Sequence, residues 1–457
     1  MAKNCIICGN PTGSREHIFP AALGGRRTNK KIYCDVHNNM YSGLAVIISD
    51  QLSLFNALLG VVGDHASETK PVTMTDLSSG KRVELTNTLI RYTDPQIISQ
   101  EAMENSIIKK MSFSSRKEAE DWVHEQRAKG FDVQMIGQGE KSKRHINTIH
   151  TKIALGGTEE GLRAIGYIAQ TFLAHYFPAV ARQPEIQGFK DYTLKNYGSD
   201  FVWWDFEPPN DLPKNNFPFG HRVIVGLNKD NSSAYARVSF FSTLNFAVHF
   251  GTLPVEASQS VITDIDPLAK SPPNDIYFWN EDAAKSPVFV PENLNSSLAE
   301  AINSGKAESC IGELIQRLVD YECQMAASYI LSKIVDAGNL SQSDRDNLFE
   351  EIISSESQRV FNLMTYVANE YKNNAIKQYE LHISSLLDRT VALDAESANG
   401  LTEEASRYLE IACKALKEQM IADYVAGVLD QDRMEMLIGG GLGAGIVGKA
   451  IFQTIMS

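Results

Sequence analysis

Cysteine is too scarce in this sequence for a chain held together by disulfides. Only six cysteines occur in 457 residues; three lie within the first 34 residues and the other three are far apart. Secreted domains that depend on disulfides are usually short and rich in cysteine. We therefore expect reduced thiols in a reducing compartment, and a single metal site built from the first three cysteines.

Long apolar runs are also missing. No stretch reaches the roughly 18 apolar residues that a membrane-spanning helix requires, and the first residues, MAKNCIICGN, lack the apolar core of a secretory signal. The longest small-residue run, MLIGGGLGAGIVG at 436–448, has the glycine spacing of nucleotide-binding loops but too little chain after it for such a fold. We expect a close-packed contact there, with membrane insertion as the weaker alternative. The sequence thus predicts a cytoplasmic protein with no membrane partner.

Positive charge is in deficit. Lys and Arg total 43 against 56 Asp and Glu, a formal net charge of −13, which argues against a general polyanion binder. Any surface for nucleic acid must then be local. The apolar content of 43% and charged content of 22% are those of an ordinary soluble protein with a core.

The order of patterns along the chain predicts an α+β protein in three parts. Residues 1–60 are expected to form a small compact head with its own chemistry, 61–290 an α+β middle domain, and 291–457 a mainly α-helical region. Within the middle part we expect a hairpin around 79–80, a helix and then a strand over 115–136, a helix over 161–177, and adjacent strands over 221–227 and 234–251. The Pro-bearing segment 201–220 is expected to be a structured loop whose paired tryptophans fill the core.

Four residues near the N-terminus have the spacing of zinc ligands. The first pair, Cys5 and Cys8, has the pattern Cys-x-x-Cys. After a gap of 25 residues, the second pair, Cys34 and His37, has the pattern Cys-x-x-His. A Cys₃His set is a closed tetrahedral zinc site, which is typically structural. The alternative is a chance clustering of cysteines.

The insert between these pairs, SREHIFPAALGGRRTNKKIY, contains further chemistry. An acid–His pair, Glu16-His17, precedes Ile-Phe-Pro and a Gly-Gly turn; Asn29 stands five residues before Cys34, and Asn38 directly follows the second pair. Over about 45 residues this composite resembles the zinc-clamped subgroup of the HNH, or ββα-metal, endonucleases. His37 departs from the commoner cysteine, but histidine is an equally good zinc ligand.

The resemblance implies roles for four residues. His17 would be the general base, because imidazole titrates near neutrality. Glu16 and Asn38 would hold a catalytic Mg²⁺ or Mn²⁺, and Asn29 would tie the loop and orient the histidine. Other interpretations remain: His17 as a zinc or core histidine, Glu16 as a surface acid, and Asn39 in place of Asn38.

Basic residues crowd the same segment. Residues 1–45 contain six positive and two negative side chains, a local net charge of +4. We expect five of the six to contact phosphates, namely Arg15, Arg26, Arg27, Lys30 and Lys31. The alternative is that they only form the solvated surface of a turn.

These patterns favour a metal-dependent HNH endonuclease that hydrolyses phosphodiester bonds in DNA. The rest of the chain is far larger than such a head requires, so we expect it to regulate cleavage through self-association into a homo-oligomer, a small effector or a regulatory protein partner. Bacterial restriction and antiviral defence effectors are often built in this way, which is an analogy at the level of fold. The alternative is a non-catalytic zinc-knuckle module that binds nucleic acid or protein.

Overall fold

The computed structural model describes most of the chain. The described residues are 4–76, 80–86, 89–104, 106–113, 115–136, 149–150, 155–195, 200–206, 208–209, 212–281, 302–335, 337–373 and 403–456. Contacts divide the chain into two compact units: 1–72, 85–89 and 152–316 form the first, and 73–84, 90–151 and 317–457 form the second. The first unit contains every residue of the predicted site.

The N-terminal segment has the expected order of two strands and a helix. Strand β1 (Glu16–His17) pairs antiparallel with β2 (Thr28–Asn29), with the short helix η1 (Ala21–Leu23) between them. Helix α1 (Asp35–Gln51) follows, and a bend at Leu52 leads into α2 (Ser53–Leu59). The buried face of α1, with Tyr41, Leu44 and Ile48, packs against a helix from the middle of the chain.

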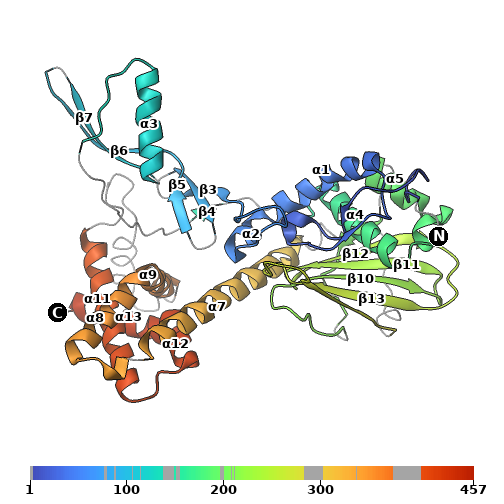
Figure 1. Ribbon diagram of the computed structural model, residues 1–457. Helices are drawn as coiled ribbons and strands as arrows, with labels where there is room; N and C mark the ends of the chain where they lie inside the picture. The colour runs from blue at the N-terminus through green and yellow to red at the C-terminus, as the bar shows by residue number, and fades with distance from the viewer. Residues whose placement is uncertain are drawn as a thin grey trace. The chain divides into compact units, whose positions relative to one another are not determined.

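That partner helix is α4 (Glu159–Tyr176), which lies between the N-terminal segment and a sheet (Figure 1). Every residue from Ala164 to Ala174 is buried, as expected for a helix covered on all sides. Thr158 caps its first turn by accepting from the Gly161 N–H. After the turns η2 (Val180–Arg182) and η3 (Pro184–Ile186), α5 (Gln187–Lys195) packs beside it.

The sheet of the first unit has six antiparallel strands in the order β14-β13-β10-β11-β12-β9. They are β9 (Val202–Trp204), β10 (His221–Asn228), β11 (Ser233–Phe240), β12 (Leu244–Thr252), β13 (Gln259–Ile265) and β14 (Asp275–Trp279). The expected neighbours β10, β11 and β12 are confirmed, as are the buried Trp203 and Trp204. Because these tryptophans pair with β12, part of the expected loop is a strand at the sheet edge.

The described part of the second unit consists mostly of two small sheets and the C-terminal helices. Strands β3 (Val72–Asp76), β4 (Arg82–Thr86), β5 (Leu89–Tyr92) and β8 (Ile149–His150) form a sheet in the order β5-β4-β3-β8; β6 (Gln96–Ala102) and β7 (Ile107–Ser112) form another. Strands β3 and β4 are hydrogen-bonded neighbours, whereas residues 77–79 of the turn expected around 79–80 lie outside the described residues. Helix α3 (Arg116–Ala128) is confirmed, but the strand expected after it is wrong: 131–136 carry none.

The predicted helical C-terminal region is confirmed. Its helices are α7 (Lys306–Ile334), α8 (Gln342–Ser355), α9 (Ser357–Asn373), α11 (Glu403–Val425), α12 (Gln431–Ile438) and α13 (Gly441–Met456), with η5 (Ala337–Asn339) before α8. The glycine-rich run enters α13 directly after α12, so it lacks the preceding strand of a nucleotide-binding loop. Taken singly, no described helix has the length and apolarity to cross a membrane; two bent pairs, α1 with α2 and α12 with α13, reach that level only together.

The contacts group residues differently from the three predicted segments. The head shares a compact unit with 152–316, whereas most of 73–151 belongs with the C-terminal helices. The physical reason lies in α4, whose apolar surface is buried against both α1 and the sheet.

Candidate active site and metal centre

The four predicted zinc ligands converge on one point. Their ligand atoms all lie within 4.8 Å of one another. The sulfurs of Cys8 and Cys34 are 3.8 Å apart, and Nδ1 of His37 lies 3.6 Å from Cys5 Sγ and 3.3 Å from Cys34 Sγ. Tetrahedral bond lengths for zinc require edges of about 3.8 Å between two sulfurs and about 3.6 Å between sulfur and nitrogen. The group can therefore hold a metal ion such as zinc.

Local electrostatics favour the ligand forms of two members of this group. Desolvation raises the pKa of the Cys34 thiol, but hydrogen bonds, led by the backbone N–H of His37, outweigh it and leave that pKa lowered. Burial lowers the pKa of His37, which keeps the imidazole neutral and its lone pair available. Backbone bonds fix the first pair: the Cys5 N–H donates to Asn10 O, and the Ile6 N–H donates to Ile32 O.

Glu16 and His17 point to opposite faces of the hairpin, because consecutive residues of a strand alternate. Glu16 is 6% exposed, and its carboxylate accepts a hydrogen bond from the Tyr167 hydroxyl of α4. His17 lies on the outer face with a side chain that is 17% exposed. We expected Glu16 to hold the catalytic cation beside His17, but the structure places its carboxylate in the core.

The buried position changes the acidity of Glu16. Burial raises its pKa to about 7, and the hydrogen bond from Tyr167 opposes this only in part. In the unfolded chain the carboxyl group has its ordinary pKa of 4.5. Between pH 4.5 and about pH 7, the folded state therefore keeps a proton that the unfolded state has released.

We expect Glu16→Gln to stabilise the protein at high pH and not at low pH. Well below pH 4.5 the carboxyl is neutral in both states and the wild type keeps its full stability, which then falls as pH rises from about 4.5 toward 7 and levels off above it. The neutral amide avoids this loss, which amounts to about 3 kcal/mol. Denaturant unfolding at pH 4.5, 6 and 8 measures the difference, with exposed Glu256→Gln as control. An equal difference at all three pH values would contradict the buried ionisation.

His17 has neighbours that sequence analysis did not predict. Its Nε2 lies 3.0 Å from Oδ2 of Asp64, and its ring meets that of His65 edge-on at 5.2 Å between centroids. One ligand atom from each of the three side chains lies within 4.8 Å of the others. Asp64 and His65 come from the segment after α2, which returns to the hairpin: the Asp64 N–H donates to Ala21 O.

Asp64 determines which nitrogen of His17 carries the proton. The hydrogen bond from His17 is the main cause that lowers the Asp64 pKa, and bonds from Arg26 add to it against desolvation. Since an ionised carboxylate can only accept, Nε2 of His17 must donate. The lone pair of the neutral imidazole is then on Nδ1.

Asn29 ties the loop as expected but contacts a different histidine. Its Oδ1 accepts from the Lys31 N–H at 2.8 Å, and its Nδ2 lies 2.9 Å from Nδ1 of His175. Burial lowers the pKa of His175 to about 4, so the neutral ring can accept this bond. Asn29 pairs with Glu16 across the strands and therefore shares the inner face of the hairpin.

Asn38 lies in the first turns of α1. Its Oδ1 is buried and has no hydrogen-bond partner in the described part of the chain. No hydrogen bond or ligand cluster among those residues joins it to His17. The expected role of Asn38 as a cation ligand stays a prediction. Asn39, the alternative to it, is exposed.

The five basic residues divide into two groups. Arg26 and Arg27 are held by acids: Arg26 Nη1 lies 3.0 Å from Asp64 Oδ1, and Arg27 Nε lies 2.7 Å from Asp275 Oδ2. The other three are exposed, namely Arg15, Lys30 and Lys31. The electropositive surface that remains on the hairpin is smaller than the sequence predicts.

The sequence patterns did not predict that Asp64 and His65 belong to the site, or that Arg26 has a structural role in it. The dipeptide Asp-His at 64–65 repeats the acid–His order of Glu16-His17, which was the available signal. Comparisons of the chain with protein-family models, curated proteins and solved structures find no match.

Proposed function

We propose that this protein is a metal-dependent phosphodiester hydrolase of the HNH type that acts on DNA. The observation that carries the proposal is the orientation of His17, whose ring is fixed by Asp64 on the outer face of a hairpin that the Cys₃His cluster can hold through a metal ion. A purely architectural knuckle requires neither the Asp–His pair nor the second histidine beside it.

The chemistry assigned to His17 is proton transfer. Its Nδ1 accepts the proton of an attacking water, while Nε2–H remains hydrogen-bonded to the Asp64 carboxylate. This carboxylate stabilises the imidazolium that forms. A side chain that is 17% exposed can reach both solvent and substrate.

Asp64 and His65 are the residues that fit a catalytic cation on this face. Each oxygen of Asp64 accepts one bond, from His17 or Arg26, and a carboxylate oxygen has a second lone pair to offer. Mg²⁺ or Mn²⁺ requires only one or two protein ligands of this kind and keeps several waters. When bound, such an ion offsets the charge that develops on the scissile phosphate and the leaving oxygen.

The remaining parts of the proposal concern partners. Exposed Arg15, Lys30 and Lys31 are the hairpin side chains that we assign to the DNA backbone. Zinc is the metal that we assign to the Cys₃His cluster. We further propose a regulated cytoplasmic effector of the bacterial defence or restriction type, which the rest of the chain controls through oligomerisation, an effector or a protein partner.

One observation favours the second candidate, a non-catalytic interaction module. Arg26 and Arg27 are neutralised by Asp64 and Asp275, so the hairpin presents less positive charge to DNA than expected. In that case the metal cluster would only support a binding surface.

The test is cleavage of supercoiled plasmid with Mg²⁺ or Mn²⁺. We expect wild-type protein to nick the plasmid and His17→Ala to be slower by the 10²–10⁴-fold that a general base is typically worth, or about 10³-fold. The matched control is His124→Ala, which removes an exposed histidine of α3.

Equal nicking by wild type and His17→Ala would remove His17 from the mechanism. Binding of plasmid by the wild type without cleavage, in either Mg²⁺ or Mn²⁺, would favour the interaction module.

A further inference from the structure

We propose that Arg26 is a positioning residue, which holds Asp64, and through it His17, in place by bridging them to the turn between β13 and β14. This inference rests on the proposed function, since it deepens the account of the same site. It replaces the phosphate contact that the sequence suggested for Arg26.

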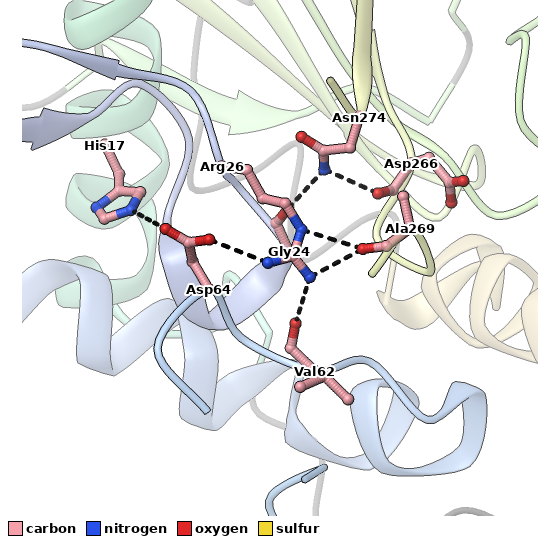
Figure 2. A network of polar contacts seen from close by, with 8 residues as sticks. All are labelled: His17, Gly24, Arg26, Val62, Asp64, Asp266, Ala269 and Asn274. Carbon is pink, nitrogen blue, oxygen red and sulfur yellow. Dashed lines mark hydrogen bonds and ion pairs between the residues drawn. The ribbon is translucent and has the colours of Figure 1, made fainter. Parts of the chain in front are cut away.

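The guanidinium of Arg26 is directed at the protein. Its side chain is 5% exposed, and Nη1 donates to Asp64 Oδ1 at 3.0 Å, the oxygen that His17 does not use. The Asp64 carboxylate is therefore held at both ends, by His17 on Oδ2 and by Arg26 on Oδ1 (Figure 2). A carboxylate held in this way cannot rotate about its terminal bond without losing a charge-assisted hydrogen bond.

Three further bonds fix Arg26 itself. Nε and Nη2 both donate to Ala269 O, at 3.0 and 2.8 Å, and Nη2 also donates to Val62 O at 3.3 Å. Val62 lies two residues before Asp64, and Ala269 lies in the β13–β14 turn. One planar group thus joins the hairpin, the segment after α2 and the sheet, which a single-point ammonium cannot do.

The turn that carries Ala269 is itself docked on the hairpin. Asn274 Nδ2 donates to Gly24 O at 2.7 Å and to Asp266 O at 2.9 Å (Figure 2). Gly24 has a φ of +86°, and a Cβ there would come within 2.7 Å of Pro267 Cα. The glycine of this turn therefore allows close approach of the β13–β14 turn.

These contacts form one continuous series from the sheet to the site, which runs from the β13–β14 turn through Arg26 and Asp64 to His17. The expected consequence is a fixed tautomer of His17, with the proton on Nε2 and the lone pair on Nδ1. Arg26→Met removes the bridge while keeping an apolar stem of similar length. Arg26→Lys keeps the charge beside Asp64 but not the fork.

The test reads the tautomer directly. In protein with ¹⁵N-labelled histidine, the His17 ring resonances, assigned by their loss in His17→Ala, report which nitrogen is protonated at pH 8. We expect a single Nε2–H form in the wild type, a mixture of both tautomers in Arg26→Met, and an intermediate spectrum in Arg26→Lys. An unchanged His17 spectrum in both Arg26 variants would overturn the proposal; if Arg26→Met does not fold, Arg26→Lys decides it.

Cleavage kinetics separate positioning from DNA contact. We expect Arg26→Met to lower kcat on the order of 10²-fold at unchanged KM, because the misplaced groups act after binding. A phosphate contact would instead raise KM and reduce the salt dependence of binding; that result with an intact tautomer would also overturn the proposal.

Arg27→Met is the matched control. Arg27 lies on the same hairpin and contacts the same part of the sheet, through Asp275 and the Tyr277 ring at 4.9 Å, but it does not contact Asp64. Its His17 spectrum is expected to match the wild type. If the wild type cleaves no DNA, the proposed function fails while the spectra still decide whether Arg26 positions His17.

Discussion

Replacing Cys34 by serine is expected to release the metal from the N-terminal cluster and to unfold the hairpin that carries His17. A structural zinc site is worth on the order of 10 kcal/mol of apparent binding free energy near neutral pH. Cys34 is the N-cap residue of α1 in an extended conformation. Because serine is a favoured N-cap, the substitution removes a metal ligand without penalising the helix.

The measurement combines metal content with hydrogen exchange. We expect about one zinc per wild-type chain and none in Cys34→Ser, with exchange accelerated over 4–33, where the Cys5 and Ile6 N–H groups hydrogen-bond to Asn10 and Ile32. Cys310→Ser, a substitution of a cysteine in α7, is the control and should keep both zinc and protection. Intact protection in metal-free Cys34→Ser would show that packing against α4 alone holds the hairpin.

The metal cluster could be predicted from sequence because its information is local. Two ligands three residues apart in each pair restrict the backbone to a tight turn, and only the joining of the two pairs is a tertiary event. The same holds for the C-terminal helices, whose patterns are periodic. Helix α4 is different: its helical pattern could be predicted, but the surfaces that cover it on all sides could not.

The site around His17 could be predicted only in part, because its partners are distant in the chain. Asp64 is 47 residues from His17 and arrives there through the lengths of α1 and α2 and the bend at Leu52. Arg26 and Ala269 are 243 residues apart. The predicted role of Glu16 is not supported by its position, since successive strand residues alternate between faces and its carboxylate is buried beside Tyr167.

Asp64→Asn is expected to lower phosphodiester cleavage by about the same factor as loss of His17, 10²–10⁴-fold. The amide oxygen of asparagine suits the Arg26 donor, which turns the NH₂ group toward His17. Nε2 of His17 must then accept, so its proton moves to Nδ1, the nitrogen that has to take a proton from water. A carboxylate-to-amide change thus leaves the ring in place with the wrong tautomer.

Two comparisons make this result specific. Asp50→Asn, at an exposed ion pair with Lys70, is the control and should cleave at the wild-type rate. Residues that act as one unit are strongly non-additive, so His17→Ala combined with Asp64→Asn should be no slower than His17→Ala alone. Multiplied losses in the double variant would mean that Asp64 contributes mainly by holding the cation and not by orienting His17. The same ¹⁵N spectra should show the proton of His17 on Nδ1 in Asp64→Asn, which ties the kinetic loss to the hydrogen bond that fixes the ring.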